Sequence, residues 1–320
     1  MNIVAADWIP YCLPLRRAWQ TSRSTHTERR GQLLRLTDAD GRTGWGDCAP
    51  LPEFGIDEAV ARAFAEECAT LDLAAQRAGL PLNAWLSGRA SVASVAVNVN
   101  FGPVLAVDRN RLAQAAAKGF TVAKLKVGIA PVDDEIAALH RLATALPRTL
   151  RLRLDANRAW PLATAQRFIA ACAGLPIDGL EEPLADPTHA LLARLQASAA
   201  FPLAIDESIH LLDAPFFRHP PVRRLVLKPA RHGGLLASVQ LALRARASGL
   251  EVIVTSSLES ACGLTACAHL AAAIAPEACH GLATAAWFAT DTGALPDIVG
   301  GRQLLPLRCG LGFTVSTNFG

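Results

Sequence analysis

Five acidic or lysine side chains stand at the ends of short apolar runs in the sequence. They are Lys126, Asp155, Glu181, Asp206 and Lys228, and successive members are 22 to 29 residues apart. One strand, one helix and two loops of a βα unit occupy about that length. Because the carboxyl ends of the strands in an α/β barrel meet at the catalytic edge, this spacing predicts that the five side chains converge there.

The segment Arg151–Trp160 is the clearest of these units. Leu152 and Leu154 alternate with arginines, which is the periodicity of a strand. Asp155 and Asn157 then favour a turn, and a proline opens the Ala-rich helix that follows. Asp155 alone could be an ordinary turn residue. The repetition of the pattern at four further strand ends favours a functional role.

Three carboxylates at one edge predict a metal site. Asp155, Glu181 and Asp206 would repel one another there, so a cation is expected to hold them. Oxygen ligands without histidine or cysteine favour Mg²⁺, with Mn²⁺ as a possible substitute. The eight cysteines contain no CxxC and the eight histidines no HExxH. The alternative, that each carboxylate pairs with an arginine such as Arg153 or Arg158, suits one position better than three.

Lysine is rare in this chain, and three of its four lysines lie at the predicted edge. Arginine stays charged, whereas a buried lysine can lose its proton and act as a base. Lys126 and Lys228 are expected to face each other across the metal, with Lys124 on the same side of its strand as Lys126. The ammonium of Lys124 and the metal would both make Lys126 easier to deprotonate. Lys126 could then take the α-proton of a metal-bound carboxylate substrate, giving an enediolate that the metal stabilises, while Lys228 returns a proton or stabilises the anion.

Neighbouring polar residues could orient this machinery. Asn157, Glu182 and Glu207 adjoin the candidate ligands and are expected to hold ligands or lysines in place. Phe54 lies in the loop Leu51–Gly55, which is either an ordinary surface loop or a cover that excludes water from the reacting centre.

A further set could bind the substrate. Ser256 and Ser257 follow a predicted strand and are expected to seat the anionic groups of the substrate together with Arg153. Gly233-Gly234 opens a helix whose N-terminal amides favour an anion. Arg153 could instead be a structural ion-pair partner.

The predicted fold class is α/β, a modified TIM barrel of seven to eight βα units with an α+β capping domain. Residues 1–90 form the predicted capping domain, completed by roughly 286–320, and 91–285 form the barrel. A hairpin is expected to join 32–37 to 43–46, followed by a helix over 56–79. The predicted barrel strands are 92–100, 123–126, 151–155, 179–181, 203–206, 224–228, 251–255 and 278–282. The predicted helices include 111–118, 134–144, 162–173, 235–248 and 263–274.

Composition narrows the classes of function. The chain has 320 residues, 51% of them hydrophobic, and a net charge of +3 that is too small and scattered to favour nucleic acid. The N-terminus shows no secretory signal, and the uncharged stretch 260–276 is expected to be a buried helix, not a membrane span. We therefore expect a cytoplasmic monomer or small homo-oligomer, with reduced cysteines, whose partner is a small-molecule carboxylate substrate.

Five ordered motifs carry a family resemblance. KLKVG, RLRLDANRAW, GLEEPL, LAIDES and LVLKP resemble the motifs of the enolase superfamily in its muconate-lactonizing-enzyme subgroup. The resemblance spans nearly the whole chain and implies a capping domain on a modified TIM barrel that binds Mg²⁺. It implies that Lys126 is the base, that Lys228 lies opposite, and that Asp155, Glu181 and Asp206 bind the metal.

Within the subgroup the chain most resembles the o-succinylbenzoate synthases of menaquinone biosynthesis. The supporting stretches are Arg151–Trp160, Thr255–Ser260 and Gly263–Thr265. The resemblance implies a lyase that dehydrates 2-succinyl-6-hydroxy-2,4-cyclohexadiene-1-carboxylate, with one lysine making both proton transfers and the other contacting the anionic intermediate. One departure lies in the capping domain, where the usual GWGE reads GWGD at 44–47.

Two other functions remain open. Dipeptide epimerases and N-succinylamino acid racemases share these catalytic residues. Epimerases typically carry Asp-x-Asp after the last strand to bind an α-ammonium, whereas the corresponding region 281–292 has only Asp291. A barrel that binds a metal or ligand without catalysis is a different class, but two lysines beside three carboxylates suit that role poorly.

Overall fold

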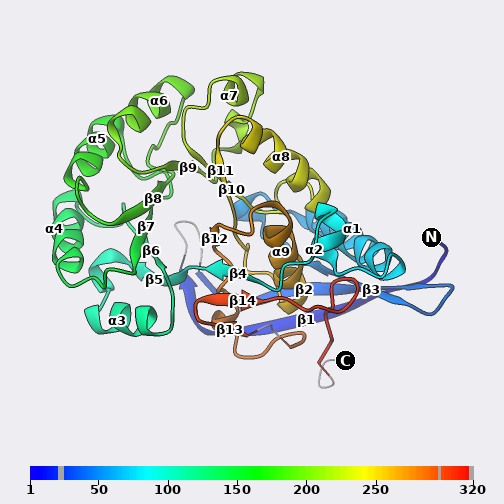
Figure 1. Cartoon of the computed structure of the whole chain (residues 1–320). Coiled ribbons are helices and arrows are strands. Elements are labelled where there is room, and N and C mark those ends of the chain that lie inside the picture. Colours follow the sequence, from blue (N-terminus) through cyan, green and yellow to red (C-terminus); the bar gives the residue numbers. More distant parts are fainter. Residues whose placement is uncertain (21–24, 295–296, 317–320) are drawn as a thin grey trace.

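The computed structural model describes residues 1–20, 25–294 and 297–316. Residues 21–24 of the predicted capping domain, and 295–296 and 317–320 of its predicted C-terminal completion, lie outside the described residues. Figure 1 shows strands surrounded by helices, with a three-stranded sheet beside them.

Parallel strands close into a barrel. Seven hydrogen-bond in the order β11-β10-β9-β8-β7-β6-β5 within the described chain. They are β5 (Val99–Pro103), β6 (Val122–Lys126), β7 (Arg151–Asp155), β8 (Ile177–Glu181), β9 (Leu203–Ile205), β10 (Arg224–Leu227) and β11 (Glu251–Val254). β12 (Cys279–His280) pairs with β4 (Ser94–Val97), which leads directly into β5, and Gly281 bridges Thr255 after β11. β12 thus fills the gap between the two ends of the sheet.

A helix follows each barrel strand from β5 to β11. These helices are α3 (Arg109–Ala117), α4 (Val132–Ala143), α5 (Leu162–Ala171), α6 (His189–Ser198), α7 (Ala214–Arg218), α8 (Leu235–Ala247) and α9 (Ala261–Ile274). Short 3-10 turns η2 (Val104–Ala106), η3 (Ile209–Leu211) and η4 (Ala285–Trp287) complete the loops. The described chain therefore has seven βα units and a final strand, and the predicted modified TIM barrel is confirmed. None of the described helices is both long and apolar enough to cross a membrane.

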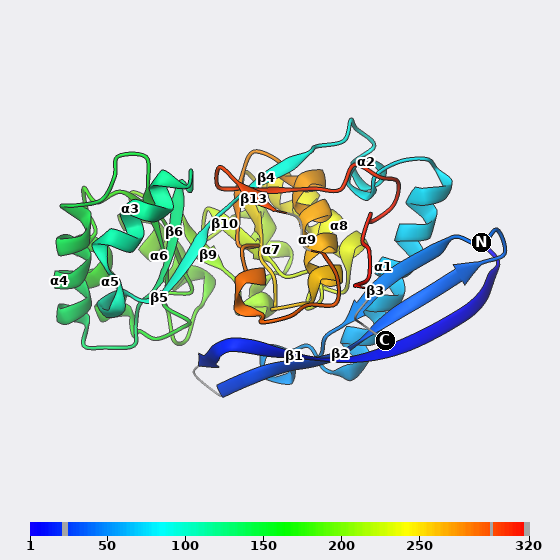
Figure 2. The ribbon, with the colours of Figure 1, turned by 90° about the horizontal axis from the view of Figure 1, so that it is seen from below.

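The separate sheet is antiparallel and packs on a helix. It contains β1 (Ile3–Gln20), β2 (Thr25–Asp38) and β3 (Thr43–Cys48). The predicted hairpin is β2–β3. α1 (Glu58–Arg77) begins at the N-cap Asp57, whose side chain accepts from Val60 N. Gly44 and Gly46 allow β3 to approach α1, since a Cβ at either position would collide with a carbonyl oxygen of that helix. Figure 2 shows this sheet running below α9 toward the barrel.

The remaining elements tie the two parts together. α2 (Leu82–Ser87) packs against α9, and η1 (Pro52–Phe54) forms part of the loop before α1. β13 (Ile298–Val299) and β14 (Arg302–Leu304) form a hairpin that pairs with β4. The chain then returns to the first part of the molecule, where Gly310 bridges Pro81.

The strands at the start of the barrel and at the N-terminus differ from the sequence expectation. The predicted strand 92–100 is two strands, because the chain changes neighbours at Asn98, from β12 on one side to β6 on the other. β1 was not predicted at all. Two prolines interrupt its pattern. Of its described side chains only Tyr11 and Leu13 are buried, so its alternation is short.

Candidate active site

The five strand-end residues meet at one edge of the barrel. Lys126 pairs with Asp155 across β6 and β7, and Asp155 pairs with Glu181 across β7 and β8. Asp206 and Lys228 directly follow β9 and β10. All five therefore stand at the carboxyl ends of neighbouring parallel strands, as their spacing predicted.

Lys124 bridges two carboxylates on neighbouring strands. Its Nζ lies 2.9 Å from Asp155 Oδ2 and also contacts Glu181 Oε2. Burial alone would lower the pKa of Lys124, but the charges of Asp155, Glu181 and Asp206 outweigh burial and raise it. Burial also opposes ionisation of Asp155 and Asp206, yet the cations beside them hold the pKa of both carboxyls well below the usual range.

Lys126 is held by a second pair of oxygens. Its Nζ lies 2.8 Å from Asp155 Oδ2 and donates to Asn157 Oδ1. Asn157 Nδ2 donates in turn to Glu207 Oε1 at 2.6 Å. Asn157 and Glu207 therefore orient Lys126 through one hydrogen-bonded chain.

Asp206 pairs with two cationic side chains, Lys228 and Arg231. Its Oδ2 accepts from Lys228 Nζ at 2.6 Å, and its Oδ1 lies 2.5 Å from an Arg231 guanidinium nitrogen. Arg231 also donates to the carbonyl of Asp206. Sequence reasoning missed Arg231. The available signal was its place three residues after Lys228, in a turn where Arg231 N donates to the carbonyl of Lys228 at 3.0 Å.

Backbone conformation is unusual at this edge. The described non-glycine residues with left-handed φ are Asn157 (42°), Arg158 (63°), Glu182 (46°) and Leu258 (62°). All follow barrel strands, and such conformations gather at functional sites.

Glu182 Oε1 accepts from Asp206 N at 2.7 Å and from Ser208 N at 2.8 Å. Burial, together with the charge of Glu207, raises the pKa of Glu182 to about 7. Glu182 thus fixes the backbone that carries Asp206.

The three carboxylates fit a hard divalent cation. In the described residues no three carboxylate, histidine or cysteine side chains are close enough to hold a metal ion as they stand. Asp155 and Glu181 nevertheless share one cation, the Lys124 ammonium, and Glu181 Oε1 is buried without a hydrogen-bond partner. An oxygen-only donor set with a free buried oxygen suits Mg²⁺ or Mn²⁺. Asp155, Glu181 and Asp206 are the residues that would hold it.

Arg153 does not belong to this cluster. It is buried, its Nε donates to Asp178 Oδ2 at 2.8 Å, and another of its nitrogens donates to Asn98 Oδ1 at 3.2 Å and to the carbonyl of Cys279 at 3.0 Å. The register of β7 and β8 skips Asp178, and this irregularity places its carboxylate between Arg153 and Arg224. The expectation that Arg153 binds substrate is therefore wrong. A buried guanidinium needs acceptors for its N–H groups, and these structural partners supply them.

The two serines after β11 hydrogen-bond to Thr284 and Glu259, not to the lysines and carboxylates described above. Ser256 Oγ hydrogen-bonds Thr284 Oγ1 at 2.7 Å. Ser257 N donates to Glu259 Oε2 at 2.6 Å, and Ser257 Oγ is a buried atom without a hydrogen-bond partner. One buried hydroxyl is thus left for a ligand at the barrel edge, and its role in substrate binding stays a prediction.

The loop before α1 reaches over Lys228. The Phe54 ring centroid lies 5.9 Å from Lys228 Nζ, and the ring stacks on Trp19 with centroids 5.7 Å apart. Phe54 therefore links the antiparallel sheet to the catalytic edge. Its predicted role in excluding water is compatible with this position.

The N-terminus of α8 already holds an anion. Glu67 of α1 accepts hydrogen bonds from Leu235 N and, at 3.3 Å, from Leu236 N. Gly234 has a φ of 109°, and a Cβ there would collide with the Glu67 carboxylate. Gly233-Gly234 therefore admits Glu67, and the expectation that these amides bind substrate is corrected.

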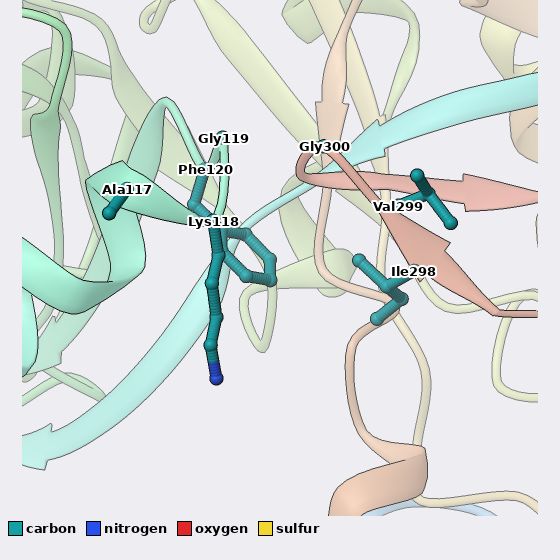
Figure 3. A pocket seen from close by; sticks show the side chains of 7 residues that line it. All are labelled: Ala117, Lys118, Gly119, Phe120, Ile298, Val299 and Gly300. Atoms are coloured by element: carbon teal, nitrogen blue, oxygen red, sulfur yellow. The ribbon is translucent and has the colours of Figure 1, made fainter.

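A pocket of about 660 Å³ lies away from this site. It is lined by Ala117–Phe120 and Ile298–Gly300 (Figure 3). Residues 117–120 precede β6, so the pocket is at the amino ends of the barrel strands, opposite the edge that carries Lys124, Lys126 and Lys228. Its lining contains no carboxylate, and we assign it no part in the chemistry.

Comparison with known proteins agrees with this architecture. The family model described as Enolase C-terminal domain-like matches residues 108–318. The o-succinylbenzoate synthase of Pectobacterium atrosepticum is 32% identical over 300 residues, which cover 86% of this chain and 88% of that protein. The o-succinylbenzoate synthase of Yersinia enterocolitica is 32% identical over 294 residues, covering 88% and 90% of the two chains.

Solved structures share the fold at lower identity. The L-Ala-D/L-Glu epimerase of Bacillus subtilis superposes with a TM-score of 0.85 at 22% identity, over 98% of this chain and 99% of that one. The muconate lactonizing enzyme of Pseudomonas putida gives 0.84 at 23% identity, over 98% and 97%. The N-succinyl Arg/Lys racemase of Bacillus cereus gives 0.87 at 19%, over 100% and 97%. With lysines and carboxylates at the carboxyl ends of a capped barrel, and with these relatives, the chain is an enzyme that belongs to the enolase superfamily.

Proposed function

We propose that this protein is a Mg²⁺-dependent lyase that forms o-succinylbenzoate from 2-succinyl-6-hydroxy-2,4-cyclohexadiene-1-carboxylate in menaquinone biosynthesis. The observation that carries the proposal is that Lys126 contacts Asp155 while Lys228 contacts Asp206 at the same edge of the barrel. Between them, Asp155 and Glu181 share the ammonium of Lys124. The 32% identity to o-succinylbenzoate synthases supports this substrate over others. We also propose a cytoplasmic location, a capping domain over residues 1–90 and a barrel over 91–285.

In this proposal Lys126 makes both proton transfers. As the neutral amine it takes the α-proton of the ring carboxylate, and the electron pair of that C–H bond passes into the carboxylate to give an enediolate. The resulting ammonium then protonates the departing hydroxyl on the same face, so water leaves as the ring becomes aromatic. Lys228, held by Asp206, supplies positive charge opposite the anionic intermediate.

The metal would take part in the reaction through its positive charge. When bound by Asp155, Glu181 and Asp206, Mg²⁺ would supply positive charge that makes the α-proton of the substrate more acidic. Asn157, Glu207 and Glu182 would keep the lysine and ligands aligned through the hydrogen bonds described above.

The second candidate is a dipeptide epimerase or N-succinylamino acid racemase. The epimerase and racemase structures above have the same fold. Their identities to this chain are 22% and 19%, so the likeness supports the fold and not the substrate. Asp291 argues against a dipeptide substrate, because its Oδ1 accepts from Ala261 N and Thr292 N, each at 2.7 Å. This oxygen is therefore engaged at the N-terminus of α9.

Turnover and metal binding test the proposal together. Purified protein with Mg²⁺ should convert the cyclohexadiene substrate and act weakly on a panel of dipeptides and N-succinylamino acids. A chelator should abolish turnover and Mg²⁺ or Mn²⁺ should restore it. Independently of activity, Mg²⁺ should raise the unfolding temperature, and Asp206→Asn should reduce that rise.

Two results would reject the proposal. Full turnover in metal-free buffer would end the metal assignment. Binding of Mg²⁺ without turnover of any member of the panel would instead favour a non-catalytic barrel.

A further inference from the structure

A second pocket, of about 280 Å³, lies at the same edge as the lysines. It is lined by Arg16, Arg17, Val99, Asn100, Ala283, Ala286 and Trp287, and we name it the Arg16–Arg17 pocket. Asn100 pairs in register with Lys124. Neighbouring strands lie about 4.8 Å apart, so the pocket begins one strand away from the lysine that bridges the carboxylates. On its other side Ala283 precedes Thr284, the hydrogen-bond partner of Ser256.

An irregularity in β1 turns the two arginines toward this edge. Pro14 pairs with Glu28 and Trp19 with His26, so four residues of β1 stand opposite one residue of β2. One of the extra residues, Leu15, pairs instead with the segment that follows β12. Leu15 forms an antiparallel bridge with Phe288, and Ala289 N donates to the carbonyl of Pro14 at 2.8 Å. Backbone contacts therefore fix the arginine pair against the chain that follows β12, as bulges do when they re-aim side chains.

The charge of the pair is not neutralised. Arg16 and Arg17 are exposed, and in the described part of the chain neither forms an ion pair with a carboxylate. The Arg17 guanidinium lies 4.2 Å from the centroid of the Trp287 ring. Stacking on an indole holds a guanidinium in place while leaving its donors free for an anion. The alanine and valine side chains supply an apolar wall beside these donors.

We propose that the Arg16–Arg17 pocket binds a second carboxylate of the substrate, at the end remote from the carboxylate that the metal holds. Paired guanidinium donors match the planar geometry of a carboxylate, and the apolar wall suits a short carbon chain leading to it. The inference rests on the proposed function, whose substrate carries two carboxylates. It extends that function by assigning the residues that select a dicarboxylate.

Binding measurements test this selection without requiring turnover. The probes are o-succinylbenzoate and its analogue in which a carboxamide replaces the succinyl carboxylate, titrated calorimetrically in Mg²⁺. Arg17→Met should weaken binding of the diacid by about ten- to a hundredfold, the range of a charge-assisted hydrogen bond, and leave the carboxamide within about threefold. Arg16→Met should act in the same direction. In turnover, KM should rise while kcat stays within about threefold.

Controls separate charge from folding. Arg17→Lys keeps the positive charge and should keep most of the preference for the diacid, even if Arg17→Met is unstable. Arg35→Met removes an exposed arginine at the far end of the same sheet, which pairs with Asp7, and should change neither affinity.

The outcomes also separate this inference from the proposed reaction. A protein that prefers the diacid through Arg17 but does not dehydrate the cyclohexadiene keeps the pocket assignment and loses the reaction. The inference is overturned if wild-type protein binds the diacid no better than the carboxamide. Equal losses for both probes in the arginine variants would overturn it as well.

Discussion

At the scale of single residues, each catalytic lysine candidate is held by a carboxylate of the adjacent strand. Lys126 contacts Asp155, and Lys228 contacts Asp206. These pairs follow from the parallel register, which sets neighbouring strand ends side by side. A lysine and a carboxylate at successive strand ends could therefore be matched from spacing alone.

Other contacts of the site were beyond sequence reasoning. The partners of Arg153 depend on one skipped residue in the pairing of β7 and β8, which brings Asp178 to it. Arg231 acts through a side chain 25 residues earlier in the chain, Asp206. Neither depends on a local pattern, because the partners are chosen by how distant segments pack.

Glu259 gives a pH-dependent prediction at this scale. It is 1% exposed, its Oε2 accepts from Ser257 N, and its Oε1 has no hydrogen-bond partner. Burial, with a contribution from Asp47 and against the charge of Arg29, raises the pKa of Glu259 from 4.5 to about 7. Between these values the folded state keeps a proton that the unfolded state has lost. The contribution of Glu259 to stability therefore falls as pH rises through that window.

Replacing Glu259 by glutamine should remove this dependence. The unfolding free energy of Glu259→Gln relative to wild type should rise between pH 5 and pH 8, by up to roughly 3 kcal/mol. Denaturant unfolding at several pH values measures it. Glu277→Gln, at an exposed glutamate, is the control and should show no such trend. Parallel curves for Glu259→Gln and wild type would contradict the assignment.

At the scale of elements, the loop containing η1 joins the antiparallel sheet to the barrel. Phe54 lies over Lys228 and stacks on Trp19 of β1. Phe54→Ala should lower kcat/KM about tenfold or more, because water would reach the reacting lysines. The loss of stability should be well below the 3–5 kcal/mol of a fully buried phenylalanine, since the ring is only partly buried.

Two measurements on Phe54 variants decide the role of this loop. Steady-state kinetics and thermal unfolding are compared for Phe54→Ala and for Phe54→Leu, which keeps an apolar cover and should retain most activity. If Phe54→Ala changes stability and leaves kcat/KM unaltered, the ring is a packing residue and not a cover.

The βα units were predictable where strand and helix periods alternate, and β1 was not. Its residues contact three different neighbours. β1 pairs with β2 along most of its length, Leu15 bridges Phe288, and Trp19 stacks on Phe54. A strand with changing partners leaves no single hydrophobic period in the sequence. The arginines of the second pocket were missed for the same reason.

At the scale of the whole molecule, the antiparallel part is anchored to the barrel by two carboxylates, of which Asp47 is buried and Glu67 is half-buried. Asp47 of β3 accepts from Ser260 N at 2.8 Å, and Glu67 of α1 accepts from Leu235 N. Each carboxylate satisfies backbone N–H groups at the start of a barrel helix. Sequence motifs indicated both parts of the molecule, but these anchors pair residues more than 150 positions apart and carry no local signal.

The central claim is that Lys126 exchanges protons with the α-carbon of a carboxylate substrate. Wild-type, Lys126→Ala and Lys228→Ala proteins are incubated with substrate and Mg²⁺ in D₂O, and α-deuterium and product are followed. Lys118→Ala, which removes the exposed fourth lysine, is the control. The account predicts that Lys126→Ala shows neither exchange nor dehydration while still binding Mg²⁺. It also predicts that Lys228→Ala is severely impaired and that Lys118→Ala matches wild type. Exchange at the wild-type rate in Lys126→Ala would contradict it.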